Sequence, residues 1–172
     1  MRNKLQKAIA LGLLLWVLFS CGCIGEEEAR IGSTAPHFQY QDINKRKGSL
    51  QDLKGKVVLL RFWANWCPYC KFEMPRIDRF YRLLGHKGFE VIPANVGDSL
   101  ELVETVGAEM NLHFPLILDP DGKLAKIYGV KGIPTNFLID RHGIIRETLV
   151  GEIFTEDRVL DDLLKPYFSK AS

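Results

Sequence analysis

Residues 57–70 read VVLLRFWANWCPYC, an apolar run that leads into two cysteines three positions apart. The first half is apolar on both faces, as a central strand of a parallel sheet should be. A helix should start directly after it, because Pro68 suits the first helical position, where its missing N–H breaks no hydrogen bond. A buried strand that passes into a helix indicates an α/β fold.

The spacing of Cys67 and Cys70 predicts a pair that can form a disulfide. Residues three apart on a helix place their Cα atoms roughly 5 Å apart, which a disulfide tolerates. Cys67 falls at the helix N-terminus, where unpaired N–H groups and the helix dipole favour a thiolate. We therefore expect Cys67 to be the exposed nucleophile and Cys70, one turn into the helix, to resolve the mixed disulfide.

The remaining chain predicts alternating strands and helices around this stretch. A helix over residues 67–84 should bend at Pro75, which removes one backbone hydrogen bond. Its apolar residues at helical spacing are Phe72, Ile77, Phe80, Tyr81, Leu83 and Leu84. Further strands are expected at residues 89–95, 114–118, 135–139 and 144–150, and further helices at residues 99–111, 124–128 and 155–168. This order predicts a central sheet with helices on both faces.

Size and composition predict one compact domain with an N-terminal addition. The chain has 172 residues, of which 47% are hydrophobic, enough to bury a core without disulfide or metal staples. The formal net charge is +2, and the two signs are interspersed without a basic stripe, which argues against nucleic acid as a partner. We place the domain at residues 35–169 and a polar linker at residues 26–34.

Residues 1–25 have the pattern of an export signal. Positive charges precede an apolar run at residues 8–19, which is shorter than the roughly 20 residues of a transmembrane helix. The cysteine that follows, in Leu-Phe-Ser-Cys21, resembles the lipidated cysteine of a bacterial lipobox, so Cys21 is the expected lipidation site. An uncleaved membrane anchor stays open, because Phe19 is bulkier than that motif usually carries, and a buried core helix is the third interpretation. The first two place the domain outside the cytoplasm and tied to a membrane.

Half a zinc site is the main rival interpretation of a Cys-x-x-Cys pair. Zinc usually takes four ligands, often from a second such pair or from two histidines at a fixed spacing. The four histidines stand far apart, at His37, His86, His113 and His142. The sequence therefore predicts no metal site, and it favours chemistry at the cysteines themselves.

Three motifs resemble those of thioredoxins. Residues 62–70 (FWANWCPYC) look like the F-W-A-x-W-C-x-x-C stretch of those proteins, and Pro75 matches the proline that kinks their active-site helix. Residues 132–135 (GIPT) resemble the segment that holds their cis-proline. The resemblance covers residues 31–168. It implies a thioredoxin-like α/β fold: a central mixed β-sheet flanked by helices, with an N-terminal β extension and an inserted α/β element.

Two further features resemble the TlpA/ResA branch of this fold, namely the sequence KFEMP after Cys70 and the insertion around residues 97–111. Members of that branch are membrane-tethered thiol–disulfide oxidoreductases, several of them linked to cytochrome c maturation. The resemblance implies an extracytoplasmic, membrane-anchored reductase with no cofactor beyond a Cys67–Cys70 disulfide. The implied partners are disulfide-bearing exported proteins, with apocytochrome c as one candidate, and a membrane thiol reductant donor.

The expected client-binding surface surrounds the cysteines. A cis bond between Ile133 and Pro134 would leave neighbouring backbone groups to pair with an extended peptide. Trp66, Pro68 and Tyr69 flank the cysteines and complete this predicted surface. An ordinary loop proline is the alternative interpretation of Pro134.

Two charged residues are expected to tune the pair. Glu73, three residues beyond Cys70, could disfavour the Cys70 thiolate by like-charge repulsion or shuttle its proton, and a solvated helix charge is the alternative. Arg61 stands where thioredoxins have a buried aspartate, and an arginine cannot act as a base. It could stabilise a thiolate, pair with Glu73, or extend to solvent from the strand edge.

The direction of electron flow stays open at this level. Pro68-Tyr69 matches the dipeptide of glutaredoxins and differs from the Gly-Pro of thioredoxins, and this dipeptide helps to set the reduction potential. A thiol peroxidase on the same fold is a second enzyme interpretation, although Ala64 replaces the threonine that those enzymes use. A copper-binding assembly chaperone, with two thiols and a histidine as ligands, is the alternative outside enzymes.

Overall fold

The computed structural model describes residues 29–168. The predicted signal segment at residues 1–25, with Cys21, lies outside the described residues, and the domain limits stay a prediction. The elements are β1 (Gln39–Gln41), β2 (Lys47–Ser49), η1 (Leu50–Leu53), β3 (Val57–Trp63), α2 (Pro68–Leu84), η2 (Gly85–Lys87), β4 (Phe89–Val96), α3 (Leu100–Glu109), β5 (Ile117–Asp119), α4 (Lys123–Ile127), β6 (Thr135–Ile139), β7 (Ile145–Val150) and α5 (Asp157–Phe168).

The central sheet has five strands in the order β5-β4-β3-β6-β7. β3 pairs in parallel with β4, which pairs in parallel with β5, while β6 runs antiparallel to both β3 and β7. β3 occupies the middle, and all seven of its residues are buried. The mixed sheet that the resemblance implied is therefore confirmed, and the strand that leads to the cysteines is its fully buried central strand.

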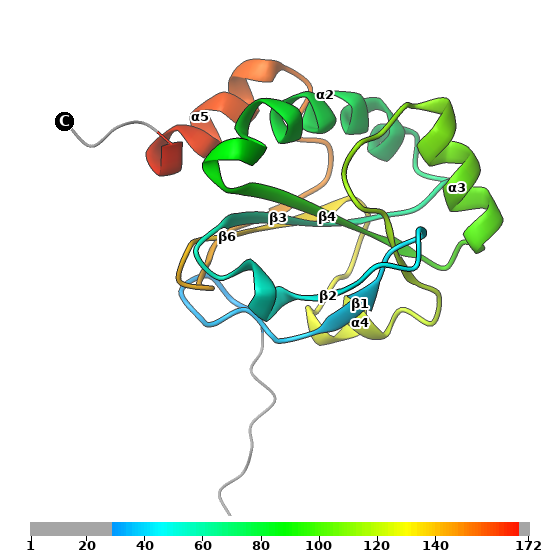
Figure 1. Cartoon of the computed structure of the whole chain (residues 1–172), viewed down its shortest axis with the longest axis horizontal. Coiled ribbons are helices and arrows are strands. Elements are labelled where there is room, and N and C mark those ends of the chain that lie inside the picture. Colours follow the sequence, from blue (N-terminus) through cyan, green and yellow to red (C-terminus); the bar gives the residue numbers. More distant parts are fainter. Residues whose placement is uncertain (1–28, 169–172) are drawn as a thin grey trace, which may run out of the picture.

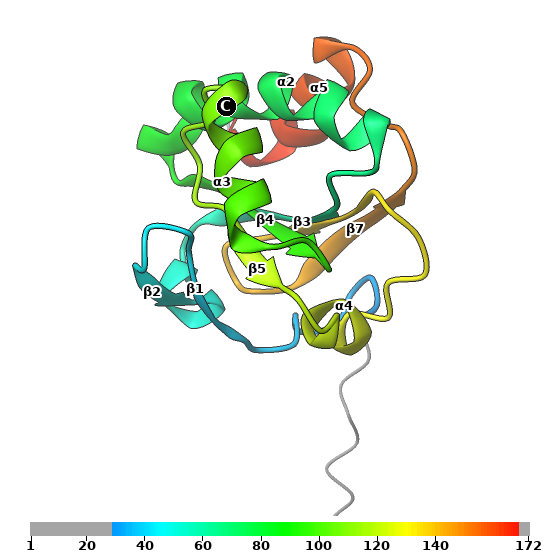
Figure 2. The same cartoon turned by 90° about the vertical axis from the view of Figure 1, so that its right-hand side faces the viewer.

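Helices and a small extra sheet cover the two faces of the central sheet (Figures 1 and 2). α2, α3 and α5 lie on one face, where Leu59, Trp63 and both cysteines of the pair belong to one apolar cluster. α4 and the antiparallel pair β1–β2 lie on the other face, over a cluster that includes Leu60 and Phe62. Successive side chains of β3 thus pack alternately into the two apolar clusters, as expected of a central strand.

The predicted order of elements is confirmed, with two differences in detail. β5 begins at Ile117, three residues later than expected, because Pro115 has no N–H to give to a ladder and Leu116 instead accepts a bond from Ile43. Phe72 is 59% exposed and Leu83 is 56% exposed, so their place in the apolar face of α2 was wrong. The buried face repeats through Cys70, Met74 and Ile77, and a position two residues from Cys70 points the opposite way.

None of the helices between residues 29 and 168 combines the length and the apolar character that a membrane crossing requires.

Candidate active site

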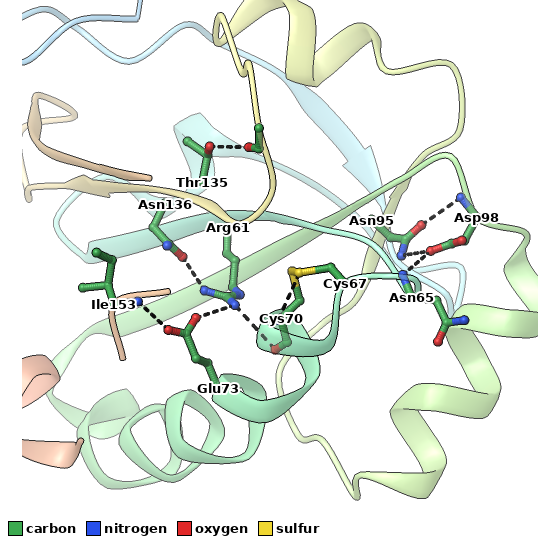
Figure 3. Close-up of a disulfide and its surroundings, with 11 residues drawn as sticks. Arg61, Asn65, Cys67, Cys70, Glu73, Asn95, Asp98, Thr135, Asn136 and Ile153 are labelled. Carbon is green, nitrogen blue, oxygen red and sulfur yellow. Dashed lines mark hydrogen bonds and ion pairs between the residues drawn. A yellow bond between two sulfur atoms is a disulfide. The ribbon is translucent and has the colours of Figure 1, made fainter. Parts of the chain in front are cut away.

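Cys67 and Cys70 form a disulfide at the point where β3 gives way to α2 (Figure 3). Their Cα atoms are 5.3 Å apart, in agreement with the helical spacing. Cys67 is the N-cap of α2, and its sulfur accepts a bond from the N–H of Cys70 at 3.1 Å. Pro68 occupies the first helical turn, as predicted. The sequence pattern therefore placed the pair correctly.

The expectation that Cys67 is exposed was wrong for the disulfide form. Cys67 is 3% exposed and Cys70 is fully buried, because both pack into the apolar cluster beneath α2. Exposure belongs instead to the flanking aromatic side chains: Trp66 is 68% exposed and Tyr69 is 53% exposed. The exposed surface of the site is therefore formed by aromatic side chains that flank the buried disulfide.

The Ile133–Pro134 peptide bond is cis, which confirms the resemblance at this segment. Ile133 packs against the same apolar cluster as the two cysteines. The carbonyl of Pro134 already accepts a bond from the N–H of Gly151 at 2.8 Å, so it is not among the backbone groups left for a peptide. Thr135, the first residue of β6, pairs with Val150, which is 62% exposed.

Arg61 and Glu73 form an ion pair beneath the disulfide. Both side chains are fully buried, and Arg61 Nη2 lies 2.7 Å from Glu73 Oε2. Arg61 Nη1 donates to Asn136 Oδ1 at 2.8 Å, and Nη2 lies 3.5 Å from the carbonyl oxygen of Cys70. Figure 3 shows the guanidinium between these groups. A solvated Glu73 and an Arg61 that extends to solvent are both wrong, because both side chains are fully buried and β3 is a central strand.

The second oxygen of Glu73 holds the segment between β7 and α5. Oε1 accepts the backbone N–H groups of Ile153 at 2.7 Å and Phe154 at 2.6 Å. Burial lowers the pKa of the Arg61 guanidinium, while the charge and hydrogen bond of Glu73 act in the opposite direction. Hydrogen bonds to both carboxylate oxygens are what makes such a buried pair tolerable.

Asn136 and the backbone of residues 153–154 are parts of the site that the sequence did not single out. Asn136 reaches Arg61 because the antiparallel register of β3 and β6 places these two residues opposite each other. The signal available in the sequence was a polar residue inside the apolar run TNFLI, two positions after Pro134. No comparable signal marks residues 153–154, since they act through their backbone.

The part of the chain between residues 29 and 168 contains no group of three or more His, Cys, Asp and Glu side chains placed to hold a metal ion. His113, one of the dispersed histidines, instead lies 3.0 Å from Asp78 through its Nδ1 atom.

Comparison with known proteins identifies the family. The model of the AhpC/TSA family matches residues 31–148. The chain belongs to the AhpC/TSA family. Within that family it is similar to the thiol-disulfide oxidoreductase ResA of Bacillus subtilis (strain 168), with 34% identity over 175 residues that cover 96% of this chain and 97% of ResA. The ResA protein of Geobacillus thermodenitrificans is 37% identical over 127 residues, 74% of this chain and 73% of its own.

Similar solved structures point to the same kind of protein. A protein assigned as the thiol:disulfide interchange protein DsbE of Chlorobium tepidum superposes with a TM-score of 0.75 at 31% identity, over 81% of this chain and 98% of its own. StoA of Bacillus subtilis gives a TM-score of 0.64 at 30% identity, over 74% and 95%. The fold is thioredoxin-like, and the protein is a thiol–disulfide oxidoreductase.

Proposed function

We propose that this AhpC/TSA protein reduces disulfides of exported proteins outside the cytoplasm, with Cys67 as the nucleophile and Cys70 as the resolving thiol. The observation that carries the proposal is the disulfide at the N-terminus of α2, on the same apolar cluster as Ile133 of the cis Ile133–Pro134 segment. A thiol at a helix N-terminus is poised to react as a thiolate.

The reaction begins with the reduced pair. The Cys67 thiolate attacks one sulfur of the client disulfide, so that a Cys67–client S–S bond forms as the client S–S bond breaks. The second client sulfur leaves with the electron pair and takes up a proton. Cys70 then loses its proton and attacks the Cys67 sulfur, which releases the first client sulfur as a thiol. The client gains two electrons and two protons, and the pair ends as the Cys67–Cys70 disulfide.

Client binding uses the exposed rim around the buried disulfide. Trp66, Tyr69 and Phe72 are all more than half exposed, and aromatic side chains supply much contact area at small entropic cost. Pro68 lies in the first turn of α2 between the cysteines, and the cis Ile133–Pro134 segment packs against the same apolar cluster, where we expect an extended client peptide to lie. The reacting client segment is therefore an extended, partly apolar peptide.

The N-terminal sequence and the ResA-like relatives support the proposed cellular setting. Lipidation at Cys21 would tie the domain to the outer side of a membrane, with a membrane thiol reductant donor to return the pair to the dithiol form. Apocytochrome c is the client class that fits cytochrome c maturation, because its haem-binding cysteines must be reduced.

The test is disulfide reduction by the fragment that begins at Glu26. It should reduce insulin with dithiothreitol as the electron source, a Cys67→Ser variant should be inactive, and a Cys70→Ser variant should accumulate mixed disulfides with the client. A Cys67→Ser variant that keeps full activity would contradict the proposal, and so would a Cys70→Ser variant that never accumulates mixed disulfides.

A further inference from the structure

A permanent positive charge lies directly beneath the reactive pair. Arg61 is fully buried on the central strand β3, and its Nη2 atom lies 3.5 Å from the backbone oxygen of Cys70. A guanidinium keeps its proton in proteins, so this charge persists at every pH at which the thiols titrate. Charges in a buried setting act strongly because little water screens them.

The acid in this pair is turned away from the thiol that it was expected to influence. One oxygen of Glu73 binds Arg61 and the other binds the N–H groups of Ile153 and Phe154. Figure 3 shows the guanidinium of Arg61 lying between the Glu73 carboxylate and Cys70. The positive end of the ion pair therefore faces the cysteine, and the carboxylate is held by donors on both of its oxygens.

Three buried donors on this face lack acceptors while the disulfide is closed. Within residues 29–168, Nε of Arg61, Nε1 of Trp63 and Nδ2 of Asn136 have no hydrogen-bond partner. All three side chains project from the face of the sheet that α2 covers, the face that also receives Cys70. Reduction of the disulfide adds two electrons and creates a sulfur at Cys70 that can accept hydrogen bonds and carry negative charge.

We propose that Arg61 is a positioning residue that clamps Glu73 away from Cys70 and stabilises the thiolate of Cys70 in the reduced protein. The inference deepens the proposed function, because a Cys70 thiolate is what resolves the mixed disulfide. It also assigns Glu73 a different task from proton shuttling: the carboxylate anchors Arg61 and the segment before α5.

Other charges near the pair do not offer the same effect. Asp98, after β4, is already bound to the backbone N–H of Asn65 and to the side chain of Asn95. Lys71 is partly exposed and Glu152 is exposed, so water screens both. Among the charged side chains near the pair, Arg61 and Glu73 are the two that are fully buried.

The experiment measures thiolate formation at Cys70 alone. In full-length protein carrying Cys21→Ser, Cys23→Ser and Cys67→Ser, so that Cys70 is the one remaining cysteine, absorbance at 240 nm is followed against pH, with and without Arg61→Met. We expect Arg61→Met to move thiolate formation to higher pH by about one unit, a tenfold loss of thiolate at a fixed pH. Arg61→Lys keeps a positive charge and should restore most of the shift. Arg82→Met, which removes a paired arginine from the last turn of α2, should leave the titration unchanged.

Arg61→Met alone leaves the buried carboxylate of Glu73 without its ion-pair partner, and the protein could fail to fold. A second variant, without either charge, keeps the inference testable in that case. Arg61→Met/Glu73→Gln replaces the pair by neutral side chains of similar size and should still shift the titration to higher pH, by less than the single variant. If either folded variant forms the Cys70 thiolate at the same pH as the parent protein without Arg61→Met, the inference is overturned. This readout needs no client, so it can fail while disulfide reduction by the unaltered protein succeeds.

The unaltered pair of cysteines gives a second measurement. If Arg61 stabilises the reduced form through the thiolate, the double variant should have a more negative reduction potential in equilibrium with dithiothreitol. A tenfold change in the equilibrium constant corresponds to about 30 mV. A potential that is unchanged or less negative in the folded double variant would overturn the inference.

Discussion

The side chains of Trp66 and Tyr69 expose apolar surface beside a disulfide that is itself buried. At the residue scale this separates binding from chemistry, because a client touches the aromatic rim while electrons pass between sulfurs below it. Substitutions on the rim should therefore affect protein clients and leave small thiols almost unaffected.

Trp66→Ala is the clearest test of that separation. Losing a central aromatic contact of about 1–2 kcal/mol corresponds to about a tenfold higher KM for a protein disulfide. The kcat value and the rate of reduction by dithiothreitol should change little. The measurement is steady-state insulin reduction, with Leu83→Ala, an exposed apolar residue at the other end of α2, as the matched control. Equal losses with insulin and with dithiothreitol would show that Trp66 acts on the sulfurs rather than on the client.

At the element scale, Asp119 joins β5 to α4. Its carboxylate is almost fully buried and accepts the N–H groups of Leu124 and Ala125 at 3.0 and 2.8 Å, at the start of that short helix. Replacing Asp119 by Ala should lower the free energy of unfolding by about 1–2 kcal/mol, the usual cost of losing a helix cap. Urea denaturation measures this, and Asp121→Ala, in an exposed ion pair two residues away, should change little. Equal effects of the two variants would argue against the capping role.

Tyr128 fixes the N-terminal segment to the core, because its hydroxyl donates to the carbonyl of Pro36 at 2.7 Å. Burial raises the pKa of Tyr128 above its ordinary value. The neutral phenol is the form that the fold favours, so its contribution is complete below about pH 10 and is lost as the pH rises toward the raised value.

Tyr128→Phe should therefore remove part of the alkaline sensitivity of the fold. Above about pH 10 the unaltered protein should lose about 1.4 kcal/mol more stability per pH unit than the variant, until its own Tyr128 ionises. At neutral pH the variant should be less stable by about 1–3 kcal/mol, since the buried carbonyl of Pro36 loses its donor. Urea denaturation at pH 7 and pH 11 tests both signs, with the exposed Tyr69→Phe as control. A constant difference between unaltered and variant protein at both pH values would contradict the assignment.

The helices and strands were predictable from the sequence where residues close together in the chain determine them. The apolar run of β3, the proline that starts α2 and the residues of β6 were all recognised from order and spacing. β5 was less predictable, because its start depends on a bond between Leu116 and Ile43 that only the folded chain brings together. Phe72 and Leu83 were placed on the buried face because an apolar residue at roughly helical spacing does not reveal which side of a helix faces the sheet.

The features of the site also divide into those that the sequence could predict and those that it could not. The cysteine pair was predictable because it depends on residues close in sequence, whereas the cis bond before Pro134 was expected from the resemblance of residues 132–135 to thioredoxins. The pairing of Arg61 with Glu73 was one of several possibilities and could not be chosen, because it depends on how α2 crosses β3. The bonds to Asn136 and to the segment after β7 depend on strand register and on the packing of α5, which spacing along the chain does not encode.

At the scale of the whole molecule, the proposal joins residues 29–168 to a membrane through Cys21. Cys21→Ser should abolish incorporation of labelled palmitate and release the protein from the membrane fraction. The described domain should keep its insulin reductase activity, because its core and its site lie entirely within residues 29–168. Cys23→Ser, two residues away, is the matched control. A Cys21→Ser protein that stays in the membrane would favour an uncleaved anchor over lipidation.

The reduction potential of the Cys67–Cys70 pair tests the central claim most directly. The fragment from Glu26 would be equilibrated with defined ratios of oxidised and reduced dithiothreitol or glutathione at pH 7, and the fraction of reduced pair measured by thiol alkylation. A reductase predicts a value near that of thioredoxin, about −270 mV. A value near that of DsbA, about −120 mV, would mean that the pair donates its disulfide to exported proteins and would contradict the account.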